Sequence, residues 1–149
     1  MTDEEINNLR NLFMTIVPVQ FQTLYSGTNN EDFAVQIIQK YGWHSEQAFR
    51  ALYCQQALGG TAVYGPGIYL TNKLSEAQSY GSNIMEFQFN KSADYLDLSD
   101  ASISKAVVKT FGGGKQKILA EPKVNALIRV TSDYFVLRTP VLVSVSLRG

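Results

Sequence analysis

Strict alternation between apolar and other residues is the feature that most constrains the fold of this chain. Residues 83–89 place Met85, Phe87 and Phe89 at every second position, and residues 141–147 repeat the pattern with three valines and a leucine. A period of two predicts β-strands with one buried face. Shorter apolar runs predict further strands at residues 21–25, 68–70, 95–98, 124–130 and 134–137.

Apolar residues at helical spacing predict helices near residues 2–17, 30–38, 45–58, 73–80 and 99–109. Thr2 or Asp3 is the expected cap of the first helix and Pro18 its end, while residues 26–30 read as a turn. Because helices and strands do not alternate regularly, we expect an α+β fold that is mainly antiparallel rather than a doubly wound parallel sheet. The length of 149 residues predicts a single domain spanning 1–149.

Composition restricts the classes of partner and cofactor. Thirteen basic residues balance thirteen acidic ones, so no net field attracts nucleic acid or lipid. Cys54 is the single cysteine and His44 the single histidine, so neither an internal disulfide nor a zinc site is expected. We therefore expect no metal cofactor.

Segments that target or anchor a protein are not expected here. Apolar runs stay below the roughly 18 residues that span a bilayer. The acidic N-terminus lacks the basic start and apolar core of a signal peptide. We expect no membrane association, and either a cytoplasmic protein or one delivered into a host cell without a cleavable signal peptide.

Residues 64–80 carry the most informative motif. Gly65-Pro66-Gly67 leads into the apolar run Ile68-Tyr69-Leu70, a short helix follows, and Tyr80 stands eleven positions after Tyr69. This segment resembles the central NAD-binding motif of the ADP-ribosyltransferase superfamily, in its poly(ADP-ribose) polymerase-like branch. That motif is a Gly-x-Gly-Ile-Tyr strand running into a helix with a second tyrosine.

Two flanking segments resemble the rest of the family's His-Tyr-Glu signature. The run Leu24-Tyr25-Ser26-Gly27-Thr28 is similar to the strand that ends in a His-Gly pair, with Ser26 in the histidine position. The run Ser132-Asp133-Tyr134-Phe135-Val136 is similar to the strand that carries the glutamate, with Asp133 in its position. The signature here is therefore Ser26-Tyr69-Asp133.

The resemblance implies a fold of two mainly antiparallel sheets that form an NAD cleft flanked by helices. Tyr69 and Tyr80 would hold the nicotinamide ring between them, as aromatic faces do. Gly27 would bring bare backbone next to the carboxamide, and Gly67 would permit a close turn into the strand, because glycine has no side chain. Gly27, Thr28 and Gly67 are therefore expected to bind NAD. Ala77 occupies a position where relatives often have a hydroxyl near the carboxamide.

The reaction implied is cleavage of the nicotinamide–ribose bond of NAD, which is the substrate. Its transition state resembles an oxocarbenium ion, which a carboxylate such as Asp133 stabilises. Asp133 is one methylene shorter than glutamate, and Ser26 is smaller than histidine but can hydrogen-bond a ribose hydroxyl. Local structure alone also accounts for these residues, with Tyr69 and Tyr80 as core residues and Ser26 and Asp133 as turn residues.

Three functions remain open at this point. The first is a mono-ADP-ribosyltransferase, such as an effector or toxin, whose acceptor is a protein or a nucleic acid. The second is an NAD glycohydrolase, in which water is the acceptor. The third is a catalytically degenerate module that binds a protein or NAD without chemistry.

Other polar residues are secondary candidates. His44 is predicted to be a surface residue at the start of a helix. Lys115 follows Gly112-Gly113-Gly114, but it lacks the spacing of a phosphate-binding loop, so this segment is predicted to be a mobile break. Glu86 and Glu121 are alternative carboxylates.

Overall fold

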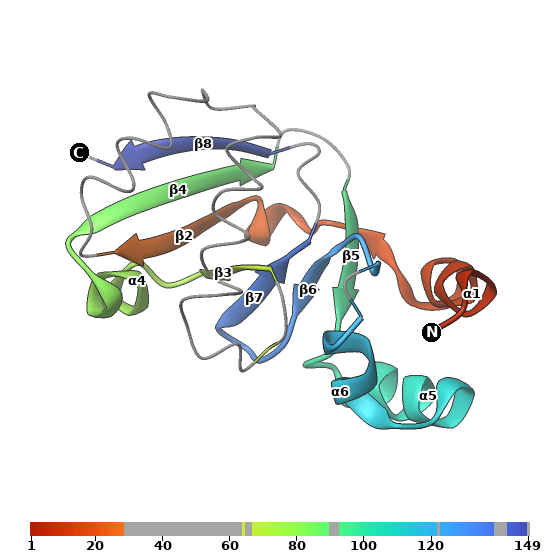
Figure 1. Ribbon diagram of the computed structural model, residues 1–149. Helices are drawn as coiled ribbons and strands as arrows, with labels where there is room; N and C mark the ends of the chain where they lie inside the picture. The colour runs from red at the N-terminus through yellow and green to blue at the C-terminus, as the bar shows by residue number, and fades with distance from the viewer. Residues whose placement is uncertain (29–63, 65–66, 90–92, 122, 139–142, 149) are drawn as a thin grey trace.

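The computed structural model describes residues 1–28, 64, 67–89, 93–121, 123–138 and 143–148, and all the strands in these residues belong to one sheet (Figure 1). The strands are β1 (Thr15–Ile16), β2 (Thr23–Thr28), β3 (Ile68–Thr71), β4 (Asn83–Phe89), β5 (Asp94–Asp97), β6 (Leu127–Arg129), β7 (Tyr134–Leu137) and β8 (Val143–Arg148). Their order across the sheet is β1-β5-β6-β7-β3-β2-β4-β8. The pair β5–β6 is parallel and the other pairs are antiparallel. The predicted α+β class with mainly antiparallel pairing is therefore confirmed.

The sheet is nearly divided in its middle. Strands β2 and β4 pair along the whole of β2, from Thr23↔Gln88 to Thr28↔Asn83, whereas β2 meets β3 at the single register pair Tyr25↔Thr71. In Figure 1, β8, β4 and β2 form the upper part of the sheet, and β3, β7, β6 and β5 form the lower part. The expectation of two separate sheets is thus corrected to one sheet, because this short contact still joins the two parts.

The described helices are α1 (Asp3–Phe13), the 3₁₀ helix η1 (Val19–Phe21), α4 (Leu74–Tyr80), α5 (Ala101–Phe111) and α6 (Gly114–Leu119). Side-chain caps start the two longest ones. In α1, Thr2 accepts a hydrogen bond from the Glu5 amide and the Glu5 side chain accepts one from the Thr2 amide. In α5, the Asp100 carboxylate accepts hydrogen bonds from the amides of Ser102 and Ile103.

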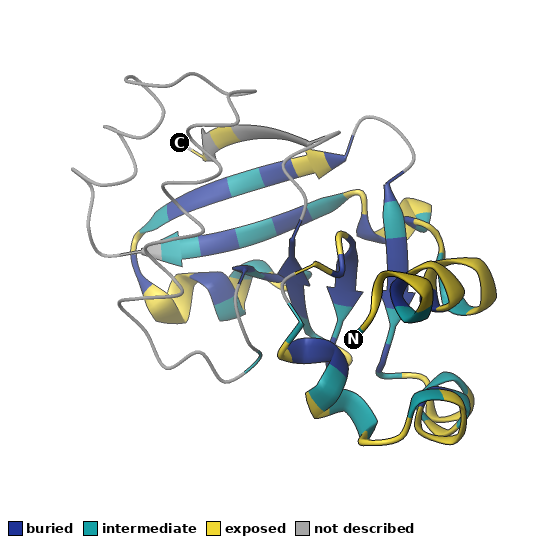
Figure 2. Ribbon diagram, turned by 45° about the vertical axis from the view of Figure 1, so that its right-hand side comes forward, coloured by how far each residue is buried: buried dark blue, intermediate teal, exposed yellow. Residues whose placement is uncertain are grey.

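Apolar side chains pack on both faces of the sheet. One face carries a buried cluster that spans both parts of the sheet and includes Leu24, Leu70, Phe87 and Phe135. The opposite face, at β5, β6 and β7, is covered by Leu9 of α1, Val107 of α5 and Ile118 of α6. Figure 2 shows the resulting alternation of buried and half-buried residues along β2 and β4.

Two boundaries differ from those expected from the sequence. Helix α1 ends at Phe13 rather than at Pro18, because Met14 turns to an extended conformation and Thr15 and Ile16 pair with β5. Residues 26–28 belong to β2 rather than to a turn, because they pair with β4. Tertiary pairing overrides the turn preference of serine and glycine here.

The segment after α5 also differs from its prediction. Gly112 and Gly113 end α5 and lead at positive φ into α6, which contains Lys115, so this segment is not the mobile break that was predicted. The helices predicted at residues 30–38 and 45–58, with Cys54 and His44, lie outside the described residues.

Candidate functional site

Helix α4 lies directly against β2 at Gly27. A Cβ at position 27 would come within 1.9 Å of the Ala77 carbonyl oxygen, and Ala77 is 1% exposed. The helix starts where the Thr71 hydroxyl accepts a hydrogen bond from the Lys73 amide, and it ends at Gly81. Glycine is therefore required at position 27 by this close packing, which brings the segment around residue 27 next to α4.

The three strands that carry or follow the signature residues are neighbours in the order β7-β3-β2. Ser26 lies on β2, Tyr69 lies on β3, and Asp133 immediately precedes β7. Tyr69 pairs with Val136 across the β3–β7 ladder. Segments that are far apart in the sequence therefore meet at the middle of the sheet.

Ser26 and Tyr69 point to opposite faces of that sheet. Tyr25 and Thr71 are directly opposite each other across β2 and β3, so their side chains point to the same face of the sheet. Tyr69 lies two residues before Thr71 on β3 and therefore points to that face as well. Ser26 is the neighbour of Tyr25 on β2, so its side chain points to the opposite face. That face buries Leu24, and Ser26 is 7% exposed. The structure thus brings the strands of the signature together without bringing the Ser26 and Tyr69 side chains to one face.

Asp133 lies in the turn between β6 and β7, beside the start of α4. Its carboxylate lies 3.2 Å from the Lys73 ammonium, and its carbonyl oxygen accepts a hydrogen bond of 3.4 Å from the Asn72 amide. Both charged side chains are partly exposed, at 57% for Lys73 and 30% for Asp133, so the pair contributes little to stability. The carboxylate therefore borders solvent and has a cationic partner.

Gly67 and Thr28 lie at strand ends. Gly67 has φ +142°, and a Cβ there would come within 2.5 Å of a Val136 methyl group, so glycine is required on both grounds. This result supports the expected close turn into β3. Thr28 is the last residue of β2, opposite Asn83.

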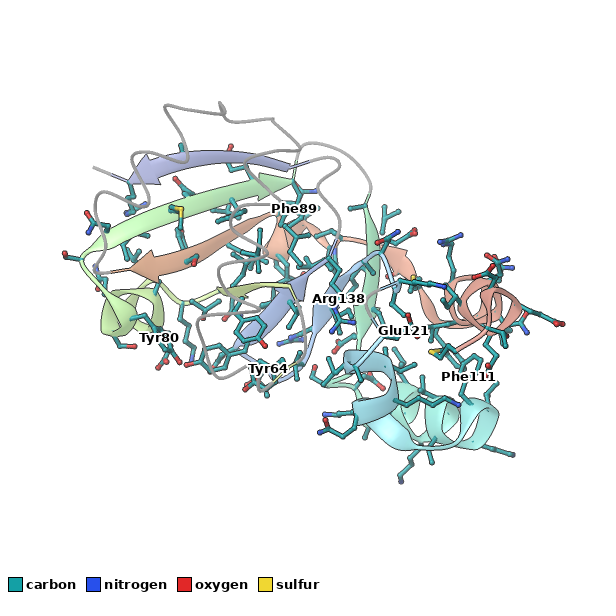
Figure 3. The ribbon with its side chains drawn as sticks, in the orientation of Figure 1. Tyr64, Tyr80, Phe89, Phe111, Glu121 and Arg138 are labelled. Atoms are coloured by element: carbon teal, nitrogen blue, oxygen red, sulfur yellow. The ribbon has the colours of Figure 1, made fainter. Side chains whose placement is uncertain are left out.

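Tyr69 and Tyr80 belong to a cluster of four tyrosines. The Tyr69 and Tyr64 rings lie 5.7 Å apart between centroids, and the Tyr64 and Tyr134 rings lie 6.3 Å apart. The Tyr134 hydroxyl in turn donates to Glu76, which lies four residues before Tyr80 on α4, and Tyr80 is 60% exposed at the end of that helix. Figure 3 shows Tyr80 and Tyr64 along the same lower edge of the molecule. Tyr64 and Tyr134 thus link the two tyrosines of the motif.

Two hydroxyls of this tyrosine cluster have shifted pKa values. The Tyr69 hydroxyl accepts a hydrogen bond of 3.2 Å from the Tyr64 amide, and burial raises the pKa of Tyr69. The Tyr134 hydroxyl donates to the Glu76 carboxylate, and this bond, followed by the effect of the neighbouring Tyr80 hydroxyl, raises the pKa of Tyr134. Ionised Tyr134 would place a second negative charge beside Glu76, which explains the direction.

Sequence reasoning missed Tyr64, Tyr134 and Glu76 as members of the site. The position of Glu76 four residues before Tyr80 was an available signal, because residues at this spacing share one face of a helix. The other two depend on the adjacency of β3 and β7, which no local pattern reveals.

Arg138, a further residue that the sequence did not indicate, links this cluster to α6. Its buried guanidinium donates hydrogen bonds to the carbonyl oxygens of Ile118 at 3.0 Å and Glu121 at 2.8 Å, both at the end of α6. It also donates to the Tyr64 carbonyl oxygen at 3.2 Å. The position of Tyr64 is therefore fixed from the side of α6 (Figure 3).

The alternative carboxylates have structural partners. Glu121 binds the N-terminal ammonium of Met1 at 3.2 Å, and Glu86 lies 4.0 Å from Arg148 between β4 and β8. Lys115 donates to the carbonyl oxygen of Val130 at 3.4 Å.

The described residues hold neither a metal-binding cluster nor a membrane-spanning helix. They contain no group of three or more His, Cys, Asp or Glu residues that could hold a metal ion. Among the helices described, none has the length and apolar character needed to cross a membrane. No family model, curated protein or solved structure matches the chain.

Proposed function

We propose that this chain is an ADP-ribosyltransferase-like domain that binds NAD beside residues 64–80 and transfers ADP-ribose to a macromolecule, releasing nicotinamide. One observation carries this proposal: β7, β3 and β2 are adjacent. The three signature segments, at residues 24–28, 68–71 and 132–136, therefore meet in space. If the three segments resembled the family only by chance, their strands would not be expected to be neighbours in the sheet.

Tyr80 and the backbone near Gly27 are the proposed contacts of nicotinamide. Tyr80 is 60% exposed, so its ring can offer a flat face to a ligand. The contact between Gly27 and the buried Ala77 carbonyl fixes β2 against α4, so the end of β2 lies beside the helix that carries Tyr80. Tyr69 on β3 lies beside Tyr64, and Tyr64 lies beside Tyr134.

The proposed reaction breaks the bond between the nicotinamide nitrogen and ribose C1′. The bonding electron pair moves to the pyridinium ring, which becomes neutral nicotinamide, and the ribose becomes an oxocarbenium-like cation. A carboxylate stabilises that cation, and Asp133 is assigned this role. An acceptor nucleophile then bonds to C1′ and loses its proton to a base.

A second function, binding without chemistry, is favoured by two observations. Ser26 lies on the face of the sheet opposite to Tyr69, and the Asp133 carboxylate is paired with Lys73. A site with this arrangement could bind NAD or a protein and leave the glycosidic bond intact.

Nicotinamide release from labelled NAD distinguishes the two functions. We expect the wild-type protein to release nicotinamide. In Asp133→Ala the rate of release should fall at least tenfold, because the catalytic carboxylate that is positioned at the ribose has been removed. Asp94→Ala is the matched control, because Asp94 also forms a partly exposed ion pair, with Arg10 at 3.2 Å. Binding of NAD without release supports the binding module, and absence of binding contradicts both functions.

The acceptor decides between transferase and glycohydrolase. Mass spectrometry of a cell extract incubated with the protein and NAD would detect an added ADP-ribose on protein or nucleic acid. Free ADP-ribose as the single product indicates that water is the acceptor.

A further inference from the structure

Glu76 differs from the other partly buried carboxylates in its surroundings. Asp97 pairs with Arg129, Glu5 with Lys117, and Glu121 with the N-terminal ammonium. Within the described part of the chain, Glu76 has no basic partner. Lys73, the residue immediately before α4, is already paired with Asp133. No cation of the described residues therefore neutralises the negative charge of Glu76.

A hydrogen bond fixes this carboxylate beside Tyr80. Glu76 and Tyr80 are four residues apart on α4, so their side chains lie on one face of the helix. The Tyr134 hydroxyl donates to the Glu76 carboxylate. A carboxylate that Tyr134 holds in place thus lies on the same helix face as an exposed aromatic ring.

An aromatic ring beside an unneutralised carboxylate favours flat cations. Aromatic faces attract cations, and a nearby negative charge adds to that attraction. The nicotinamide ring of oxidised NAD carries one positive charge, whereas the ring of NADH and free nicotinamide carry none. The same site therefore has an electrostatic means of telling these ligands apart.

We infer that Glu76, held in place by Tyr134, makes the site selective for the positively charged nicotinamide ring of NAD over the uncharged rings of NADH and nicotinamide. This inference rests on the proposed function. Glu76 acts here as a specificity-determining residue and Tyr134 as a positioning residue. After the glycosidic bond breaks, the ring has lost its charge, so the same carboxylate also favours product release.

Parallel titrations with NAD and NADH test this inference. The variants are Glu76→Gln and Tyr134→Phe, with Glu4→Gln as a control because Glu4 is an exposed carboxylate on α1. We expect Glu76→Gln to raise the Kd for NAD about two- to fivefold, the effect of one partly screened charge, and to change the Kd for NADH less than twofold. Tyr134→Phe should act in the same direction, and 1 M salt should reduce the selectivity of the wild-type protein.

The outcomes separate this inference from the proposed function. Equal weakening of NAD and NADH in Glu76→Gln indicates a purely structural role and overturns the inference, as does unchanged binding of both. Either result leaves NAD binding by the wild-type protein intact, so the proposed function stands. Failure of the wild-type protein to bind NAD overturns the proposed function and the inference with it.

Discussion

Gly27 on β2 and Ala77 on α4 are in backbone contact, so close that a single Cβ at position 27 would lie 1.9 Å from the Ala77 carbonyl oxygen. The contact joins two segments that are fifty residues apart in the sequence. It holds α4, and with it Glu76 and Tyr80, against the middle of the sheet. The candidate site depends on this contact more than on any single polar interaction.

Gly27→Ala should therefore destabilise the fold and displace α4. The obstacle is backbone rather than a flexible side chain, so we expect a loss of about 2–3 kcal/mol in the free energy of unfolding. Urea denaturation followed by circular dichroism measures it. Gly113→Asn is the control, because asparagine tolerates the left-handed φ of 78° and the nearest atoms there belong to the flexible Lys117 side chain. A loss no larger in Gly27→Ala than in Gly113→Asn would contradict this packing.

The strands with the clearest alternation were predicted well. Residues 83–89 form β4 with the predicted boundaries, because a period of two is a local property of the sequence, and the apolar run 134–137 forms β7 as predicted. The turn predicted at Ser26 failed because β4 supplies partners that the local sequence does not contain. Helix α6 was missed because three glycines precede Lys115, and glycine is typical of loops. The helix is also stabilised by Arg138, which binds its last carbonyl oxygens and is distant in the sequence.

The candidate site was predicted less completely than the fold. The motif of residues 64–80 indicated Tyr69 and Tyr80, and both belong to the tyrosine cluster. Tyr134 joins them only because β7 lies next to β3, a relationship set by the topology of the whole sheet. Its bond with Glu76 follows from that same adjacency, so a single sequence could not have indicated the pair.

Arg138→Met should be strongly destabilising, because it leaves several buried carbonyl oxygens without their donor. Arg138 is 3% exposed and binds carbonyls at the end of α6 and at Tyr64. We expect a loss of about 2–4 kcal/mol in the free energy of unfolding, measured by urea denaturation. Arg10→Met removes a partly exposed ion pair and should cost less than about 1 kcal/mol. Similar losses in the two variants would contradict the role assigned to Arg138.

Tyr95 should make stability fall at alkaline pH. Burial, with a smaller contribution from the charge of Asp97, raises the pKa of Tyr95 to about 12, whereas an unfolded tyrosine has a pKa of about 10. Below pH 10 both states are protonated and the stability is intact. Between pH 10 and 12 the unfolded state ionises first, so stability falls by up to about 3 kcal/mol.

Tyr95→Phe should remove this contribution to the pH dependence. Among the described residues none hydrogen-bonds the Tyr95 hydroxyl, so the variant should be as stable as the wild-type protein at pH 7, within about 1 kcal/mol. Urea denaturation at pH 7, 10 and 11.5 provides the comparison. An equally steep alkaline loss in Tyr95→Phe would show that other groups cause it.

Calorimetric titration of NAD into Tyr80→Ala and into the wild-type protein shows whether the chain binds NAD through Tyr80. Because Tyr80 is 60% exposed, its truncation leaves the core intact, which circular dichroism verifies. Our account predicts that the wild-type protein binds NAD and that Tyr80→Ala raises the Kd by about tenfold, the value of one stacked aromatic ring with its buried area. Absence of NAD binding by the wild-type protein, or an unchanged Kd in Tyr80→Ala, would contradict it.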